Sequence, residues 1–316
     1  IFFYSDQVSA EMAEINVENE LCATTDLDKV KVYNRLYGAD GKLVLEMMQE
    51  SALVSDAPRT VHNRGQISKP HLWSPDYPYL YTLETAVEYG EGKTSVIGRQ
   101  LVGIRSIKFD PDQGFFLNGK PEIFKGVCVH HDAGCLGAAV TKEVWRRRLV
   151  KLKIMGCNAI RMSHNPHMPE LYELCDELGF LVMDEAFDEW EAPKNKWHIG
   201  HNVYPPKHQG YAEDFPHWHE QDLTAMVRRD RNYPSVVMWC IGNEIDYPND
   251  PYAHPSFETM TGNNDENKSH VQRKYSPDRP NAERLSVIAP RLVNIVKKSD
   301  TTRPVTSAVS FPELST

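Results

Sequence analysis

The chain has 316 residues, of which 41% are hydrophobic and 25% are charged, as in ordinary globular proteins. Its net charge of −9 argues against nucleic acid as the main partner, because proteins that bind phosphate backbones usually present a basic face. No apolar stretch approaches the roughly 20 residues that a membrane-spanning helix needs, and the first ten residues do not form an intact signal peptide. We therefore expect a soluble protein, with a periplasmic and a cytoplasmic location both open.

The six cysteines contain no CxxC pair, which argues against a zinc ribbon or a thioredoxin-like site. Several of them lie within or beside apolar runs. Buried, reduced thiols are therefore the expectation.

Residues 1–108 have the pattern of an all-β domain. Alternating or β-rich segments occur at 13–17, 29–33, 42–45 and 79–84, and turn signals separate them at 38–41, 74–75, 77–78 and 90–92. Short strands with this spacing predict a small β-sandwich. No cluster of candidate catalytic residues occurs here, so we expect a structural or positioning role.

Residues 109–316 alternate between strand and helix. The pattern predicts strands at 122–129, 157–162, 180–183, 236–241 and 304–309, and helices at 142–155, 169–178, 215–230 and 284–298. This alternation is typical of βαβ units around a parallel sheet, and we expect no hairpin to interrupt it.

Four successive predicted strands end in polar, ionisable or aromatic residues, at 130–132, 161–167, 184–190 and 243–244. A single strand that ends in such residues could arise by chance. Four in succession indicate a shared site at the carboxyl face of a barrel. The clearest of them is VVMWCIGNE at 236–244, a strand buried on both faces that stops at Asn243 and Glu244. A carboxyl among apolar neighbours there can act as a general acid. The alternative is that these two residues only lead into a turn or cap a helix.

At these motifs the sequence resembles glycoside hydrolase family 2, which contains β-galactosidases, β-glucuronidases and β-mannosidases. The matching strings, in family order, are LWSPDYPYLY (72–81), GIRSI (103–107), FLNGKPEIFKGVCVHHD (116–132), MGCNAIRMSHNPH (155–167), LCDELGFLVMDEAFDEW (174–190) and RDRNYPSVVMWCIGNE (229–244). The DEAFDEW string and the His130-His131 pair look most like the β-galactosidase-like members.

The resemblance implies an immunoglobulin-like β-sandwich over 1–108, followed by about the first five strands of a (β/α)8 TIM barrel over 109–316. It also implies retaining hydrolysis of a terminal β-linked sugar, so the expected partner is a β-linked oligosaccharide or glycan. In that reaction one carboxyl protonates the leaving oxygen and a second attacks the anomeric carbon.

The resemblance assigns roles to single residues. Glu244 matches the family's acid/base residue, and Asn243 matches the amide that holds the sugar 2-hydroxyl. Arg161 matches an arginine that pairs with the nucleophile. Sugar contacts are implied for His130, His164 and Trp190.

Each role has a structural alternative. Arg161 could form a structural salt bridge, His164 could bond a strand end, and one of His130 and His131 is expected to be structural. Asp184 and Glu185 could organise hydrogen bonds behind the site, and Asp184 is expected to be structural. The loop histidines, which are His198, His201, His208, His217 and His219, have irregular spacing that favours solvent or substrate-rim positions over a metal site.

The resemblance also bears on a metal. Glu189 matches an acidic residue that binds magnesium in some β-galactosidases. The neighbouring metal histidine of the family is replaced here by Glu191, which argues against a complete site. Magnesium is therefore the one candidate cofactor, and none is certain.

The family places its nucleophile on the seventh barrel strand, beyond the part that matches here, and a sugar-binding jelly roll before the sandwich. We therefore expect an internal portion of a longer enzyme, with the nucleophile outside this chain and the isolated chain inactive. The open edge of an incomplete barrel also favours association into a homo-oligomer. The leading prediction is a β-galactosidase. The alternatives are a β-glucuronidase or β-mannosidase of the same family, or a non-catalytic carbohydrate-binding module.

Overall fold

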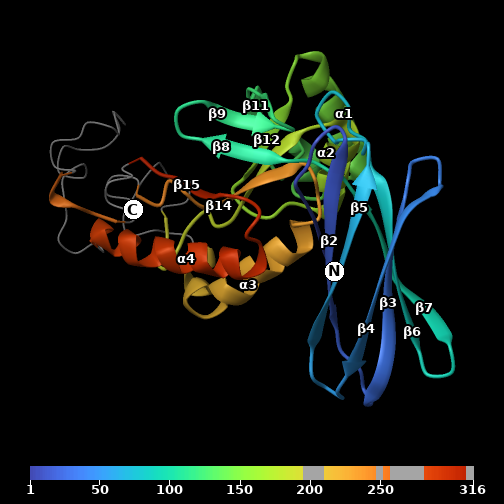
Figure 1. Ribbon diagram of the computed structural model, residues 1–316. Helices are drawn as coiled ribbons and strands as arrows, with labels where there is room; N and C mark the ends of the chain where they lie inside the picture. Colours follow the sequence, from blue (N-terminus) through green and yellow to red (C-terminus); the bar gives the residue numbers. More distant parts are fainter. Residues whose placement is uncertain (195–209, 247–251, 257–280, 311–316) are drawn as a thin grey trace.

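A computed structural model describes residues 1–194, 210–246, 252–256 and 281–310. An antiparallel sandwich comes first in the chain and a parallel sheet with helices comes second (Figure 1). The strands of the sandwich are β1 (Phe2–Asp6), β2 (Met12–Leu21), β3 (Leu27–Tyr37), β4 (Leu43–Leu53), β5 (Arg59–Ser68), β6 (Tyr81–Tyr89) and β7 (Lys93–Val102).

The two sheets of the sandwich are β1-β2-β5 and β4-β3-β6-β7. Alternation along β3 explains the packing, because Val30, Val32 and Leu36 all face inward and are fully buried. Asn34 occupies one inward position of the same strand and donates to Thr85 Oγ1 at 2.8 Å. The sandwich predicted from short alternating segments is confirmed.

The second half contains the parallel sheet β11-β12-β13-β14-β15, whose spatial order equals its chain order. Its elements, with the intervening helices, are β11 (Gly126–His130), η1 (Gly134–Leu136), α1 (Lys142–Ile154), β12 (Ala159–Ser163), α2 (Pro169–Leu178), β13 (Leu181–Glu185), η2 (Tyr211–Glu213), α3 (Phe215–Asp230), β14 (Val236–Asn243), η4 (Ala282–Arg284), α4 (Leu285–Ser299) and β15 (Val305–Ala308). This order of parallel strands and helices is that of the start of a TIM barrel, which confirms the predicted fold class.

An antiparallel sheet joins the two halves, and here the expectation of an uninterrupted βαβ pattern was wrong. It consists of β8 (Ile107–Asp110), β9 (Gly114–Leu117) and β10 (Lys120–Pro121). The turn between β9 and β10 is Asn118-Gly119, and both residues have positive φ, which is the signature of a tight hairpin turn. Phe115 and Leu117 of β9 pack against residues at the amino ends of the barrel strands. The predicted domain division after residue 108 falls inside β8.

The sandwich packs closely against the barrel half. A Cβ added to Gly103 would lie 2.7 Å from the Pro234 ring, and one added to Gly179 would lie 2.2 Å from the carbonyl oxygen of Pro75. The indole of Trp73, which is fully buried, donates to the carbonyl of Asp176 at 3.0 Å. The sandwich therefore supports the amino ends of the barrel strands, opposite the ends where the polar motifs lie.

The expectation of buried thiols holds only in part. Cys175 and Cys240 are buried and Cys157 is partly buried, but Cys22, Cys128 and Cys135 are exposed. Cys128 lies on the exposed face of β11, whose residues alternate between exposed and partly buried positions. Among the helices that the structure describes, none is long and apolar enough to cross a membrane.

Candidate active site

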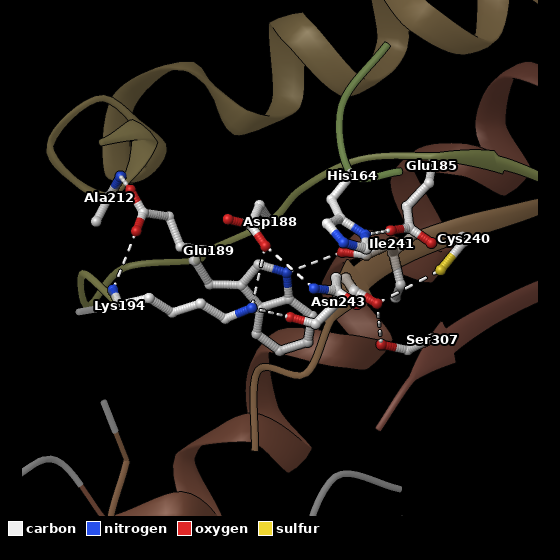
Figure 2. A network of polar contacts seen from close by, with 12 residues as sticks. His164, Glu185, Asp188, Glu189, Lys194, Ala212, Cys240, Ile241, Asn243 and Ser307 are labelled. Carbon is white, nitrogen blue, oxygen red and sulfur yellow. Dashed lines mark hydrogen bonds and ion pairs between the residues drawn. The ribbon is translucent and has the colours of Figure 1, made fainter. Parts of the chain in front are cut away.

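The polar motifs meet at the carboxyl ends of the parallel strands. Arg161 lies on β12, Glu185 ends β13 and Asn243 ends β14, so parallel pairing brings three segments far apart in sequence to one edge. Figure 2 shows Glu185 and Asn243 in this network, with His164 beside Glu185. The polar ends of these strands therefore lie close together, at one edge of the sheet.

Arg161 is the central cation of the site. Its Nε donates to Glu185 Oε2 at 2.6 Å, and its Nη2 donates to Glu185 Oε1 at 2.9 Å and to Asn243 Oδ1 at 2.8 Å. This fork geometry is a strong charge-assisted arrangement. The carboxylate that Arg161 holds in the described part of the chain is Glu185, and Asn243 is oriented by the same guanidinium.

Glu185 is fully buried, yet it is held ionised. Burial by itself would raise its pKa, but hydrogen bonds from His164 and Arg161 outweigh burial and place the pKa below its ordinary value. His164 Nδ1 lies 2.7 Å from Glu185 Oε1. Because an ionised carboxylate can only accept, this geometry assigns the proton of His164 to Nδ1.

Asn243 is held on several sides. Its Oδ1 accepts from Arg161, its Nδ2 donates to Asp188 Oδ1 at 3.1 Å, and its backbone N–H donates to the carbonyl of Phe187 at 3.2 Å. The side chain is 5% exposed. Asn243 therefore presents a fixed amide at the edge of the site.

Glu244 follows directly and has an unusual backbone. Its φ is +45°, a left-handed value that costs energy for a residue with a side chain. Its N–H donates to the carbonyl of Ala308 on β15 at 2.6 Å. The Glu244 side chain is exposed, so the apolar enclosure expected from the sequence is not found in the described part of the chain.

The two adjacent histidines at the end of β11 point in different directions. His130 is exposed, and its ring stands edge-on to that of His164 with centroids 5.0 Å apart. His131 points into the helix layer, where its ring lies 5.3 Å from that of His167 and 6.0 Å from that of Trp145. Burial lowers the pKa of His167 to about 4, so this inner histidine is neutral. Of the pair, His130 is the one beside the site.

Asp184 precedes Glu185 and faces the opposite way. It is fully buried, and Tyr172 donates to its Oδ1 at 2.7 Å. Burial, and then the nearby Asp230, raise the pKa of Asp184 far above its ordinary value. Asp230 is paired with Arg229 through two bonds of 2.7 Å, so Asp184 is the partner that keeps the proton. Asp184 lies behind the site, as expected from the sequence.

Trp190 and Glu189 are in the core rather than at an open surface. Trp190 is 1% exposed and its indole donates to the carbonyl of Ile241 at 2.8 Å, so the structure offers no open ring face for the predicted sugar contact. Glu189 is also 1% exposed and accepts from the backbone N–H groups of Lys194 at 3.0 Å and Ala212 at 3.2 Å (Figure 2).

These surroundings do not favour the magnesium that the resemblance suggests. The carboxylate of Glu189 accepts from two backbone N–H groups, and a Cβ at Gly210 would lie 1.8 Å from its Oε1. In the described residues no three His, Cys, Asp or Glu side chains are grouped to hold a metal ion. Among the described residues, Glu189 is therefore not accompanied by the further donors of a complete magnesium site.

The loop histidines lie in different surroundings where the structure describes them. His198, His201 and His208 lie outside the described residues, and His217 is exposed. His219 is buried, with its ring stacked on Phe215 and its Nδ1 at 2.5 Å from the Phe215 carbonyl. The expected rim position was therefore wrong for His219, which lies on the buried face of α3.

Two site residues were not singled out from the sequence. Asp188 bonds the amide of Asn243, and the ammonium of Lys194 contacts both Asp188, at 3.1 Å, and the backbone carbonyl of Asn243 (Figure 2). Asp188 lies in a motif that the resemblance includes, so it could have been found. Lys194 lies among other polar residues, where no spacing distinguishes it.

Comparisons with known proteins agree with this architecture. The model of "Glycosyl hydrolases family 2, TIM barrel domain" matches residues 110–311, and the model of "Glycosyl hydrolases family 2" matches residues 1–105. A β-galactosidase of Bacteroides ovatus is 38% identical over 98% of this chain and 35% of its own length. A putative β-glucuronidase of Formosa agariphila is 33% identical over 77% of this chain and 22% of its own length.

Solved structures give the same result. A family 2 glycosyl hydrolase of Bacteroides cellulosilyticus has a TM-score of 0.78 and 33% identity, over 99% of this chain and 35% of that one. A β-glucuronidase of Bacteroides uniformis has a TM-score of 0.72 and 29% identity, over 99% of this chain and 34% of that one. The chain thus spans about a third of the length of the first relatives it matches. With both halves matched by the family's models, the chain belongs to glycosyl hydrolase family 2.

Proposed function

We propose that this chain carries the acid/base half of a retaining exo-β-glycosidase, with Glu244 as the acid/base residue and terminal β-galactosides as substrates. The observation that carries the proposal is the end of β14. There the amide of Asn243 is held between Arg161 and Asp188, and the next carboxyl, Glu244, is exposed. A proton donor must reach the leaving oxygen, which an exposed carboxyl beside a fixed amide can do.

The surrounding groups suit a sugar. Asn243 has a second amide proton for a sugar hydroxyl, because one N–H is used by Asp188. His130 and His164 lie together on the β11–β12 side and offer ring nitrogens to further hydroxyls. The expected partner is therefore a β-linked oligosaccharide or glycan.

Retaining hydrolysis needs a second carboxyl about 5–5.5 Å from the first. The carboxyl groups at the end of β13 are poor nucleophiles in this arrangement. Asp184 faces the helix layer, Glu185 is bound by Arg161 and His164, and Glu189 is buried against backbone N–H groups. We propose that the nucleophile lies outside this chain, and we expect the isolated 316-residue chain to be inactive.

A second candidate substrate has support of its own. The Formosa agariphila relative and the Bacteroides uniformis structure are both named β-glucuronidases. The Bacteroides ovatus relative, which is more identical to this chain, is named a β-galactosidase. We therefore place β-galactosides first and β-glucuronides second.

The test is a panel of aryl β-galactoside, β-glucuronide and β-mannoside, assayed with the full-length protein, its Glu244→Gln variant and the isolated chain. Loss of the acid should lower the rate on an unactivated disaccharide by about 100-fold or more. On an activated aryl glycoside the glycosyl-enzyme should accumulate, and added azide should restore turnover.

The matched control is Glu91→Gln, which changes an exposed glutamate in the β6–β7 turn of the sandwich and should leave all rates unchanged. Normal rates of Glu244→Gln on the disaccharide would refute the assignment. Absence of turnover on the whole panel by the full-length protein would support a carbohydrate-binding module instead.

A further inference from the structure

We propose that Lys194 is a positioning residue for Glu244, acting through the peptide group that joins Asn243 to Glu244. This inference rests on the proposed acid/base role of Glu244. It concerns a side chain of the loop after β13, four residues beyond the polar segment 184–190, and a peptide group at the end of β14.

The Asn243–Glu244 peptide group is held at both of its ends. Its carbonyl oxygen, which belongs to Asn243, accepts from the ammonium of Lys194. Its N–H, which belongs to Glu244, donates to the carbonyl of Ala308 on β15 at 2.6 Å. Because a peptide group is planar, two bonds at opposite ends define the orientation of its plane.

The orientation of that plane matters because φ of Glu244 is the rotation between this peptide group and the glutamate. The observed φ of +45° is unfavourable for a residue with a Cβ, so the surroundings must maintain it. The direction of the Glu244 side chain follows from this φ. Lys194 and Ala308 thereby hold the Cα–Cβ bond of Glu244 in the direction from which its carboxyl extends.

Lys194 is itself well anchored. Its ammonium lies 3.1 Å from Asp188 Oδ1, and its side chain is 12% exposed. Its backbone N–H donates to Glu189 Oε2 at 3.0 Å, which holds the loop next to β13. Figure 2 shows the lysine chain extended along the site toward Asn243, with Asp188 beside its tip.

The same Asp188 oxygen accepts from the side chain of Asn243, at 3.1 Å. Asp188 therefore links the lysine to the amide that neighbours the acid. A charged donor on a backbone carbonyl forms a stronger bond than a neutral one. The contact is therefore suited to holding a peptide group in an unfavourable conformation.

The test is the Lys194→Met variant of the full-length protein, which keeps the apolar stem and removes the donor. Misdirecting the acid should slow the step that needs protonation of the leaving group. We expect kcat on a disaccharide or an alkyl β-galactoside to fall by about 10-fold to 100-fold, with KM changed less than about three-fold. On an activated aryl galactoside kcat/KM should fall by less than about three-fold, because formation of the glycosyl-enzyme then needs little protonation.

A general structural role would not produce this dependence on the leaving group. The matched control is Lys153→Met, because Lys153 is another lysine whose ammonium donates to backbone carbonyls. Its partners, Pro75 and Gly179, lie at the junction with the sandwich. Lys153→Met should lower the thermal stability and leave the ratio of the disaccharide rate to the aryl galactoside rate unchanged. Lys194→Arg, which keeps a cationic donor, should recover part of the disaccharide activity.

The failures are distinguishable. If Glu244→Gln keeps normal disaccharide rates, the proposed function is wrong and the inference falls with it. A second outcome is that Glu244→Gln loses activity but Lys194→Met lowers kcat/KM equally on the disaccharide and the aryl galactoside, or on neither. In that case Glu244 remains the acid and the positioning role of Lys194 is refuted.

Discussion

Buried or partly buried arginines lie at both ends of the parallel sheet, but their partners differ. At the amino ends, Arg105 of the sandwich donates to the carbonyls of Pro234, at 2.5 Å, and Val236, at 2.6 Å. Arg303 donates to the same Val236 carbonyl at 2.7 Å and to Asp300 at 2.8 Å. At the carboxyl ends, Arg161 instead holds two side chains, those of Glu185 and Asn243.

The kind of partner distinguishes an arginine with a structural role from one in the candidate site better than the burial of the arginine does. Backbone carbonyls are present at every position, so an arginine that binds them joins elements whatever the chemistry of the protein. An arginine that binds a carboxylate and an amide beside an exposed glutamate orients groups that can meet a substrate. A carboxylate partner alone does not mark the site, since Arg303 also binds Asp300. The difference is that Arg161 and its partners lie beside an exposed glutamate.

The largest expected effect tests this contrast directly. In the full-length protein, Arg161→Lys keeps the charge but cannot hold Glu185 and Asn243 through a planar fork. We expect kcat/KM on a β-galactoside to fall by about 100-fold, with little change in the fraction folded.

Arg303→Lys is the matched change at the other end. It should lower the free energy of unfolding by about 1–3 kcal/mol, because buried carbonyls lose their donors, and leave kcat/KM per folded molecule within about two-fold. Kinetics corrected for the folded fraction measure both variants. Equal activity losses in the two variants would remove the distinction between the ends.

The next prediction concerns the side of the sheet that faces the helices. The pKa of Asp184 is raised in the folded protein, so the folded state binds a proton that the unfolded state releases above about pH 4. The wild type should therefore lose stability as the pH rises from about 4 toward the raised pKa. Asp184→Asn mimics the protonated group. Its free energy of unfolding, relative to that of the wild type, should therefore rise by up to about 1.4 kcal/mol for each pH unit in that range.

Urea unfolding midpoints at several pH values measure this gain. Glu185 supplies a contrast of opposite sign. Its pKa is lowered on folding, so its contribution is present above the ordinary glutamate value and is lost as the pH falls through the lowered pKa. Glu185→Gln should therefore lose stability near pH 7 and lose less below pH 4. A gain for Asp184→Asn that does not change with pH would mean that Asp184 is ionised in the folded state.

The smallest effect is expected on the outer surface. Arg146 of α1 donates to Glu177 of α2 at 2.6 Å, and both side chains are substantially exposed, at 46% and 35%. Exposed ion pairs contribute little, so Arg146→Ala should change the free energy of unfolding by less than about 1 kcal/mol and leave the activity unchanged. Urea unfolding and the β-galactoside assay check both statements. A large activity loss would show that arginine partners do not predict function here.

Much of the fold follows from local patterns. The periodicity predicted helices at 169–178 and 215–230, and α2 (Pro169–Leu178) and α3 (Phe215–Asp230) have these limits. The apolar run from Val236 predicted a buried strand, and β14 is that strand. These predictions succeed because a helix or strand is specified by apolar residues spaced at its own period.

The hairpin at β9–β10 was missed although its Asn118-Gly119 turn is a local signal. Its strands are only four and two residues long, too short for an alternation pattern. They are stable because they pack against the barrel, and that packing is tertiary.

The sequence by itself determined which strand ends carry polar groups and, through the resemblance, which residues match the family's site. Only the tertiary structure decided how those groups are used. It placed Trp190 in the core, directed Asp184 and Glu185 to opposite sides of one strand, and brought Lys194 to the carbonyl of Asn243. The physical reason is that periodicity records the environment of a residue along its own element, whereas a hydrogen-bond partner from another element depends on how the elements pack.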